Sequence, residues 1–483
     1  MRKSYKIAAI YVVVLLLSLT YVAVTPTTNT QQDYAANTRS QGGIFVVPIE
    51  NYGYAPIIKH LIDNAKKSVH ISMLLLSDYE PVKTLLNSLV EAKNRGVDVK
   101  VVYEGDISSN HYGANYLSSR GVAVKEDGSS KFLHTKLVVI DDEVVYLGSH
   151  NWSPNALGKN NEYGIVIFNQ SIANVYERYF QSIWNDASST PSAGHVYESV
   201  QGLSIETTYD GYTYNELRNL IDSASQRLYV AMYTMAYYSN PNSTEERVDT
   251  LVNGIVSKRN IASVILDNHD SENAYNYLKD KGVDVMYDSK SVTTHLKLVI
   301  ADDSVYVGDA NWDYEYLDNE THTVGIIIHN ASVANFFAGY FLTIKKYGDA
   351  PYYIPDGFVD NWKIETQAGK DVNLTVYLAN GGYINDTSFY IQTRSKLNTS
   401  IYQHPSWNRS SVYDWKAENL HIHVLNNESG NYIVAITFYS KYHHINYTMY
   451  ITVNVQGEPV PEFSTYILPL MLILMAVWKK RGK

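Results

Sequence analysis

The stretch HTKLVVIDD at residues 134–142 is repeated as HLKLVIADD at residues 295–303, 161 positions later. The same offset joins two further pairs of segments, NYLSSRGVAV (115–124) with NYLKDKGVDV (276–285) and SIANVYERYF (171–180) with SVANFFAGYF (332–341). An offset that recurs in three segments between residues 115 and 180 indicates a duplicated domain.

Within each copy, short runs rich in β-branched residues alternate with amphipathic segments. VHISMLLL, VDVKVVYEG and KLVVIDD are typical of strands, whereas YAPIIKHLIDNAKK and EPVKTLLNSLVEAKNRG are typical of helices. This alternation predicts an α/β fold with a mixed sheet in each copy. We therefore expect two halves, half 1 (residues 44–190) and half 2 (residues 191–350), packed about a pseudo-two-fold axis.

Composition narrows the classes of function. The chain has 483 residues, no cysteine and a formal net charge of −10. The lack of cysteine excludes disulfides, thiolate metal sites and a cysteine nucleophile. Residues 44–350 hold 24 basic and 38 acidic residues, a net charge of −14. Such an acidic body disfavours a general nucleic-acid-coating protein, because it gives no long-range attraction for polyanions.

The pattern changes after the second copy. Residues 351–456 contain five strand-like runs separated by turn signals, which predicts a β-sandwich of immunoglobulin-like type acting as a spacer. Six N-x-[ST] sequons lie here and favour a glycosylated, exported domain: Asn373, Asn385, Asn398, Asn408, Asn427 and Asn446. His421 and His423 share a strand face, but no Asp, Glu or Cys cluster lies nearby in the sequence, so no metal site is predicted.

Both ends of the chain predict a membrane location. Residues 1–24 place basic residues before an apolar run, as in a signal peptide or an N-terminal anchor, and residues 25–43 read as a linker. At the other end, residues 457–483 hold a short apolar run followed by basic residues. Because basic flanks stay cytoplasmic, the body between them is expected outside, on the outer face of the cell membrane.

The C-terminal segment also carries Pro461-Glu462-Phe463 ahead of its apolar run. Together with the basic terminus, this tripeptide resembles the PEF-type sorting signals of archaeal surface proteins. The resemblance implies an archaeosortase-type processing enzyme as a partner, which removes the tail and attaches the protein to a lipid. A membrane helix that stays in place is the simpler alternative, and both give a tethered protein.

The repeated stretch places polar side chains together. Residues i and i+2 of a strand share a face, so His134 points with Lys136 and His295 points with Lys297. If each copy forms a hairpin centred near residue 142 or 303, Asn151 lies beside His134 and Asn311 beside His295. Asp141 and Asp302 are about 23 Å along the strand from their histidines, so a turn or structural role is expected for them.

Two His/Lys/Asn sets suit phosphodiester chemistry. The lysines supply positive charge and the asparagines supply hydrogen bonds to phosphate oxygens, which reduces the need for a metal. One histidine attacks phosphorus while the other protonates the departing alkoxide. The duplication is therefore functionally meaningful, because one histidine cannot both attack phosphorus and protonate the leaving oxygen on the opposite side.

The pattern H-x-K-x4-D followed by G-S-x-N resembles the signature of the phospholipase D superfamily. It stands here as His134-Lys136-Asp141 with Gly148-Ser149-His150-Asn151, and as His295-Lys297-Asp302 with Gly308-Asp309-Ala310-Asn311. The resemblance, over roughly residues 44–350, implies two α/β halves that share one active site and work without metal or other cofactor through a phosphohistidine. It also implies His134 as nucleophile and His295 as general acid, with the reverse assignment left open.

The family also places a glutamate after the asparagine to hold the histidine's other ring nitrogen. Glu162 matches it in half 1, whereas the 161 offset puts Thr323 at that position in half 2, and Glu320 is three residues early. Asp309 replaces the expected serine, at Ser149 in half 1, where a carboxylate would repel the phosphate. We therefore expect His295 to be less well oriented than the histidine of half 1.

These observations predict an exported, membrane-tethered phosphodiesterase with no obligate oligomer. A phospholipid head group is the favoured substrate, because of the acidic body and the tether. An extracellular endonuclease of the same superfamily is the alternative, since the motif GSHNWS followed by NNE resembles the corresponding motif of nucleases in that superfamily. A catalytically decayed surface adhesion or scaffold protein is the third, supported by Asp309 and the misplaced Glu320.

Overall fold

The computed structural model describes residues 43–128, 130–185, 193–200, 202–348, 355–359, 361–380, 389–401, 411–426, 428–440 and 446–457. The predicted signal or anchor, nearly all of the linker and of the tail, and the sequons at Asn385, Asn408 and Asn427 lie outside them. Among the described helices, none combines the length and apolarity that a membrane span requires.

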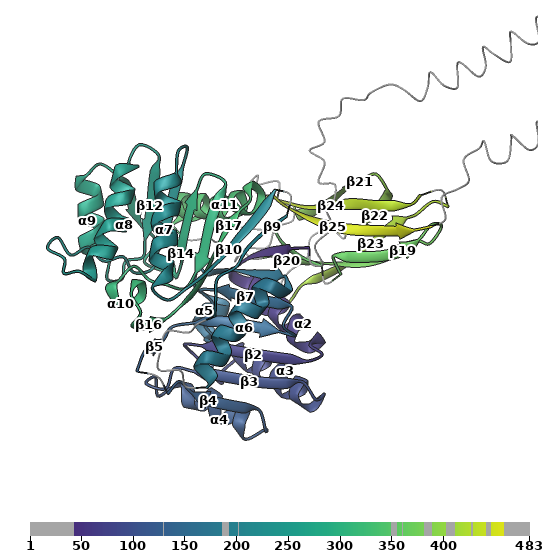
Figure 1. The fold of residues 1–483 in the computed structure, drawn as a ribbon, viewed down its shortest axis with the longest axis horizontal. Helices are drawn as coiled ribbons and strands as arrows, with labels where there is room; N and C mark the ends of the chain where they lie inside the picture. The colour runs from purple at the N-terminus through teal and green to yellow at the C-terminus, as the bar shows by residue number, and fades with distance from the viewer. Residues whose placement is uncertain are drawn as a thin grey trace, which may run out of the picture. The chain divides into compact units, whose positions relative to one another are not determined.

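Half 1 is built on a seven-stranded sheet with the order β1-β8-β7-β6-β2-β3-β4 (Figure 1). Its strands are β1 (Phe45–Glu50), β2 (Ser68–Met73), β3 (Asp98–Tyr103), β4 (Ala123–Glu126), β6 (Lys136–Ile140), β7 (Val144–Gly148) and β8 (Tyr163–Phe168), with β5 (Phe132–Leu133) outside the sheet. Its helices are the 3-10 turn η1 (Asn51–Gly53), α2 (Tyr54–Asn64), α3 (Val82–Asn94), α4 (Asn110–Ser118), α5 (Pro154–Gly158) and α6 (Gln170–Trp184).

Half 2 repeats this order from the other end, as β13-β12-β11-β14-β15-β17-β10 with β9 added at the edge. Its strands are β9 (Tyr197–Val200), β10 (Leu203–Tyr209), β11 (Leu228–Met232), β12 (Ala262–Leu266), β13 (Asp284–Tyr287), β14 (Lys297–Ala301), β15 (Ser304–Gly308), β16 (Thr321–His322) and β17 (Val324–His329). Its helices are α7 (Tyr212–Ser223), α8 (Glu245–Ser257), α9 (Glu272–Asp280), α10 (Tyr314–Leu317) and α11 (Ala331–Tyr347).

Both sheets mix parallel and antiparallel pairs, which confirms the predicted α/β fold. Strand β2 is parallel to β3 and antiparallel to β6, and β11 is likewise parallel to β12 and antiparallel to β14. Strand β2 is buried along its whole length, because both faces of the sheet are covered.

The long helices α6 and α11 begin in the same way. Asn169 and Asn330 are N-caps, whose side chains accept hydrogen bonds from the backbone N–H groups of Ile172 and Val333. Helix α6 then buries Ile172, Val175, Tyr176, Tyr179 and Phe180, a three-and-four spacing that presents one apolar face.

The two halves exchange equivalent backbone hydrogen bonds, as a pseudo-two-fold axis requires. His134 N donates to His322 O over 3.0 Å, and His295 N donates to Asn161 O over 2.9 Å. Adding 161 to His134 and Asn161 gives His295 and His322, so the second bond is the first with the halves swapped. The first residue of each H-x-K segment is therefore bonded across the interface between the halves.

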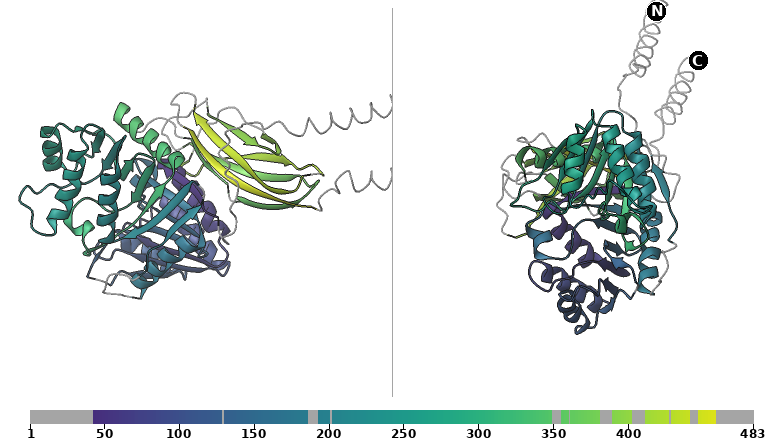
Figure 2. Two further views of the ribbon diagram at one scale, coloured as in Figure 1. Left: turned by 45° about the horizontal axis from the view of Figure 1, so that its top comes forward. Right: turned by 90° about the vertical axis from the view of Figure 1, so that its left-hand side faces the viewer.

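The C-terminal region forms two four-stranded sheets, in the orders β18-β20-β23-β22 and β19-β25-β24-β21 (Figure 2). The strands are β18 (Pro355–Phe358), β19 (Lys363–Gln367), β20 (Val372–Asn380), β21 (Phe389–Ser395), β22 (Asn398–Ile401), β23 (Lys416–His423), β24 (Gly430–Ser440) and β25 (Asn446–Gln456). The region packs on half 1, where the Tyr447 hydroxyl donates to Val46 O over 2.6 Å and Trp362 stacks on Phe45. The immunoglobulin-like class stays a prediction.

Candidate active site

Each H-x-K segment enters the central hairpin of its half. Lys136 is the first residue of β6 and Lys297 the first of β14, and both side chains are fully buried. His134 and His295, two residues earlier, are 4% and 8% exposed. The register of β6 with β7, in which Leu137 pairs with Leu147, extrapolates to residue 150 opposite His134.

In half 2 the pairing of Val299 with Tyr306 extrapolates to residue 310 opposite His295, one residue short of the expected 311. Asn151 and Asn311 follow their hairpins as predicted and are each 5% exposed. The Oδ1 atoms of both are buried with no hydrogen-bond partner among the described residues. An unpaired buried acceptor costs about 1–3 kcal/mol, so the two asparagines are held at equivalent positions at a cost in stability.

Glu162 binds a histidine, but of the other half. Its Oε2 lies 2.9 Å from His295 Nδ1, and the same oxygen accepts a hydrogen bond from Ser149 Oγ over 2.5 Å. The expectation that Glu162 serves its own half, and that His295 is the less well oriented histidine, is therefore wrong. The cause is that the backbone of Asn161 bonds to His295 across the interface between the halves, which places the next residue, Glu162, beside the imidazole of His295.

Asp309 also differs from expectation. Its side chain is fully buried, and its carboxylate accepts the backbone N–H groups of Val324 (2.9 Å) and Lys136 (3.1 Å). The predicted repulsion of phosphate is reduced, because burial raises the pKa of the Asp309 carboxyl to about 7. The same group links half 2 to the first residue of β6 in half 1.

In the described part of the chain, no hydrogen bond joins the remaining candidates of half 2 to His134 or His295. Glu320 has an exposed side chain, and its backbone carbonyl accepts the N–H of Phe132 over 3.3 Å. Thr323 is buried where the offset placed it, and its Oγ1 has no partner among the described residues. Neither residue takes the place of a second glutamate.

Positive groups crowd the site. Burial lowers the pKa of His134 well below its usual value, and the charges of Lys136 and Lys297 lower it further. Burial likewise lowers the pKa of Lys136 to about 7, against the opposing charges of Asp309 and Glu162. A bound phosphate would relieve this repulsion, so the electrostatics favour an anionic ligand.

The second histidine has a carboxylate partner. Burial lowers the pKa of His295 to about 4, and Glu162 is the largest influence in the opposite direction. Burial alone would raise the pKa of Glu162, but the charge of His295 and its hydrogen bond lower it. The two imidazoles therefore have different surroundings.

Two tyrosines border the histidines and were not singled out from the sequence. The ring of Tyr316 lies edge-on to His134 at 4.8 Å, and that of Tyr233 lies edge-on to His295 at 4.8 Å. Lys297 Nζ is also 5.0 Å from the centroid of Tyr233. The run AMYTMAYYSN at residues 231–240, which contains Tyr233, is a tyrosine-rich signal in the sequence, although buried aromatic packing is the commoner role of such a run.

Buried carboxylates also hold the residue before each histidine, which no motif indicated. Glu104 Oε2 accepts Leu133 N over 2.6 Å, and the side chains of Asp267 and Asp288 accept Thr294 N over 2.9 and 3.1 Å. These bonds fix the path of the chain into each H-x-K segment.

Asp141 and Asp302 lie in the hairpin turns, with φ of 56° and 50°. The Asp141 carboxylate accepts the backbone N–H groups of residues 66–68, and the Asp302 carboxylate accepts those of residues 225–227. Each aspartate ties its turn to the loop that precedes β2 or β11, away from the imidazoles.

Comparison with known proteins agrees with this geometry. The family described as "Cardiolipin synthase, PLD-like domain" matches residues 58–184 and again residues 217–345, just over half of the chain. The chain belongs to this family. Each match spans one half, so the duplication seen in the sequence is a duplication of the phospholipase D-like domain.

Curated relatives carry lipid and nucleic-acid names. The "Mitochondrial cardiolipin hydrolase" of Xenopus tropicalis is 29% identical over 127 residues, covering 26% of this chain and 59% of that protein. "Phospholipase D Y" of Dictyostelium discoideum is 23% identical, and the match covers 53% of this chain and 78% of that protein. "5'-3' exonuclease PLD3" of Xenopus laevis is 24% identical, and the match covers 54% of this chain and 67% of that protein. The chain thus spans about three fifths of the first of these relatives.

Solved structures show partial likeness. NUC from Salmonella typhimurium, described as a phospholipase D family member, has 27% identity and a TM-score of 0.28, over 30% of this chain and 96% of the NUC chain. Phosphatidylserine synthase from Haemophilus influenzae has 14% identity and a TM-score of 0.49, and the match covers 63% of this chain and 86% of the synthase chain.

Proposed function

We propose that this protein is an exported, membrane-tethered phosphodiesterase that cleaves phospholipid head groups through a covalent phosphohistidine, without a metal. The observation that carries the proposal is the shared site. Two buried H-x-K segments from two halves meet where Glu162 of half 1 binds His295 of half 2.

The chemistry proceeds in two balanced steps. A ring nitrogen of His134 attacks phosphorus, forming a P–N bond while the bond from phosphorus to the leaving oxygen breaks and His295 gives that oxygen its proton. Water then attacks phosphorus, losing a proton to His295 as the P–N bond breaks. Lys136, Lys297 and the amide groups of the asparagines stabilise the charge on the phosphoryl oxygens.

The different surroundings of the two histidines support this assignment. His134 lies beside Lys136, whose Nζ is 3.2 Å from its Nδ1, and its lowered pKa keeps the ring neutral with a lone pair for attack. His295 has Glu162 on Nδ1, and a carboxylate at that position stabilises the imidazolium that a general acid must be. The reverse assignment is the alternative, because the same carboxylate, holding the Nδ1 proton of a neutral His295, leaves its Nε2 lone pair available for attack.

A phospholipid substrate is favoured over a nucleic acid. The net charge of −14 on residues 44–350 repels an extended polyanion, whereas a single phosphate in a small cationic site is not penalised in this way. The names of two relatives, a cardiolipin hydrolase and a phospholipase D, agree with a lipid, and that of the exonuclease keeps nucleic acid as the alternative.

The scaffold hypothesis loses its two supports. Asp309 is bound by backbone amides, and His295 already has its carboxylate in Glu162, so Glu320 is not needed. We propose further that the terminal segments tether the body outside the cell, and that an archaeosortase-type enzyme processes the tail.

Purified full-length chain, treated with EDTA, separates these functions when it is incubated in parallel with phospholipid vesicles and with plasmid. Head-group release without nicking supports the lipid function, and nicking alone overturns it in favour of the nuclease. Turnover of neither substrate, by a chain whose fold is verified, contradicts both. A phosphoprotein trapped in His295→Asn with an activated leaving group would identify His134 as the nucleophile.

A further inference from the structure

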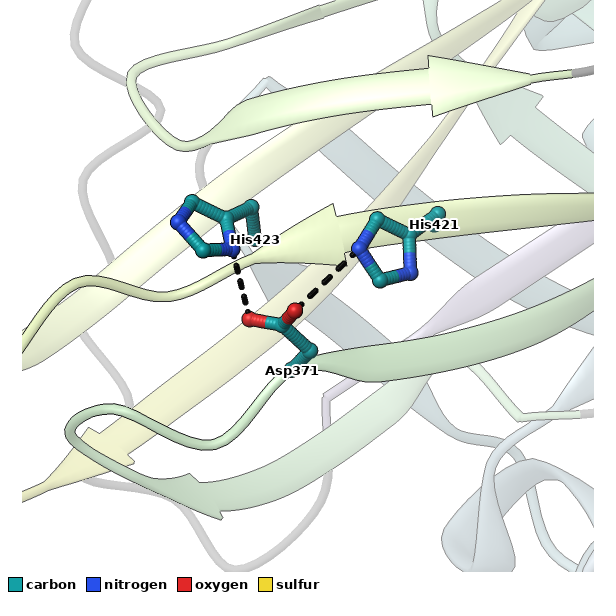
Figure 3. A group of neighbouring side chains, drawn as sticks. All are labelled: Asp371, His421 and His423. Atoms are coloured by element: carbon teal, nitrogen blue, oxygen red, sulfur yellow. Dashed lines mark ion pairs between the residues drawn. The ribbon is translucent and has the colours of Figure 1, made fainter.

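A polar cluster lies on the outer face of the C-terminal sheets, remote in sequence from the H-x-K segments. Strand β23 turns Leu420 and Ile422 inward, which leaves His421 and His423 on the outer face. Asp371 immediately precedes β20, the strand paired with β23, and its carboxylate points at both rings (Figure 3).

The distances within the cluster are short. Asp371 Oδ1 lies 2.8 Å from His423 Nδ1, and Oδ2 lies 3.3 Å from His421 Nε2. The three potential ligand atoms, one from each residue, all lie within 4.8 Å of one another. In the described part of the chain, no other group of three His, Asp or Glu side chains meets this arrangement.

A neighbouring amide orients one of the rings. Asn373 pairs with His421 across the two strands, and its Oδ1 lies 2.9 Å from His421 Nδ1. That oxygen accepts the Nδ1 proton, so the Nε2 atom of a neutral ring presents its lone pair to the Asp371 carboxylate. The lone pairs of His421 Nε2 and Asp371 Oδ2, 3.3 Å apart, repel each other unless a proton or a cation lies between them. The bond from Nδ1 to Asn373 is also the kind of support that a metal-bound histidine usually has on its second ring nitrogen.

We propose that Asp371, His421 and His423 bind a divalent metal ion of the zinc class. Imidazole nitrogens with one carboxylate suit Zn²⁺, Cu²⁺ or Ni²⁺, whereas Mg²⁺ and Ca²⁺ prefer an all-oxygen set. Ligands about 2.0–2.2 Å from zinc in a tetrahedron lie roughly 3.3–3.6 Å apart, so small side-chain movements close the site. Because the three side chains are 38–45% exposed, water completes the coordination.

This site could not be expected from the sequence pattern, because Asp371 lies fifty residues before the first histidine, His421. The pairing of β20 with β23 brings it there. A bound metal would fasten the turn between β19 and β20, which connects the two sheets, to the outer face of β23.

Metal binding to the full-length chain tests the proposal. After EDTA treatment and its removal, the chain is titrated with Zn²⁺, and the bound equivalents are counted by calorimetry and by elemental analysis. We expect wild type to bind one equivalent more than His423→Ala or Asp371→Asn, with no corresponding equivalent for Mg²⁺. Asn373→Ala, which removes only the support of His421, is expected to weaken binding about 10–100-fold.

Two control variants make the result specific. His111 forms a similarly exposed pair with Glu126, at 3.0 Å, but has no third ligand among the described residues, so His111→Ala should keep the full stoichiometry. Thr375→Ala removes the sequon at Asn373 but keeps the asparagine, and so separates the amide from any glycan. The proposal is overturned if wild type and the folded His423→Ala variant, compared by circular dichroism, bind the same number of Zn²⁺ ions.

Discussion

The two halves have the same strand order and the same H-x-K segments, yet they carry their acidic residues at different positions. Half 1 has Ser149 and Glu162, where half 2 has Asp309 and Thr323. Each acid acts across the interface: Glu162 binds the imidazole of His295, and Asp309 binds the backbone of Lys136. The duplication has therefore produced two unlike histidines, one with a carboxylate on its ring and one beside a lysine.

The largest expected effect separates the two histidines by leaving group. His134→Ala should lower kcat by at least about 10³-fold with any phosphodiester, because the nucleophile is lost. His295→Ala should slow release of the first product by a similar factor with an alkyl leaving group but much less with p-nitrophenolate, which needs no proton to depart. The losses are compared for this first step, because hydrolysis of the phosphohistidine uses His295 again whatever the leaving group. Steady-state and burst kinetics on both substrates measure this difference.

Equal losses for both variants on both substrates would contradict the assigned roles. A burst of p-nitrophenol in His134→Ala but not in His295→Ala would reverse them.

The next largest effect tests the exchanged carboxylate. Glu162→Gln should lower kcat/KM about 10–100-fold, because the support of His295 is weakened. Since the charge of Glu162 opposes the lowering of the pKa of His295, its removal should lower that pKa further. Loss of the protonated acid then moves the alkaline limb of the pH profile to lower pH.

Glu320→Gln is the matched control, because the side chain of Glu320 is exposed. Activity and pH profile of this variant should equal those of wild type. A loss in Glu320→Gln comparable with that in Glu162→Gln would show that the half 2 glutamate acts in solution.

Much of the site could be predicted from sequence because it repeats. The constant offset identified the halves, and hairpin geometry placed Asn151 and Asn311 after their strands. The partner of Glu162 could not be predicted in this way, because an offset aligns positions within each copy whereas the contact crosses between copies. Asp371 was missed for a related reason, since strand pairing brings it to His421 and His423 from far along the chain.

A smaller effect concerns the acid of half 2. Asp309→Ser installs the residue of half 1, where Ser149 Oγ accepts Tyr163 N over 3.0 Å, so a serine should still accept Val324 N. The N–H of Lys136 loses its acceptor, at a cost of about 1–3 kcal/mol. We expect a kcat/KM about tenfold lower, because the charge that opposes the lowering of the Lys136 pKa is gone.

The same variant should change how stability depends on pH. Burial raises the pKa of Asp309 to about 7 in the folded chain, above a value of about 3.9 in the unfolded chain. Between these values the folded state holds the extra proton, so the stability of wild type falls as pH rises from about 4 to 7. Thermal melts of Asp309→Ser should lack this part of the fall; a parallel pH dependence in both proteins would contradict a buried, protonated Asp309.

The smallest effect tests residues at which the halves are alike. Asp302→Asn should leave catalysis unchanged and cost about 1 kcal/mol, because the turn loses a charged acceptor for the backbone of residues 225–227 at a largely exposed site. Burial alone would raise the pKa of Asp302, but the hydrogen bonds from Arg227, Ser225 and Gln226 lower it to about 2. This contribution is present above about pH 4 and is lost as pH falls through about 2, so the difference in thermal midpoint between wild type and variant should shrink over that range. Asp303→Asn, one residue along the same turn, is the control with little expected effect, and a drop in kcat for Asp302→Asn with unchanged stability would instead place Asp302 in the chemistry.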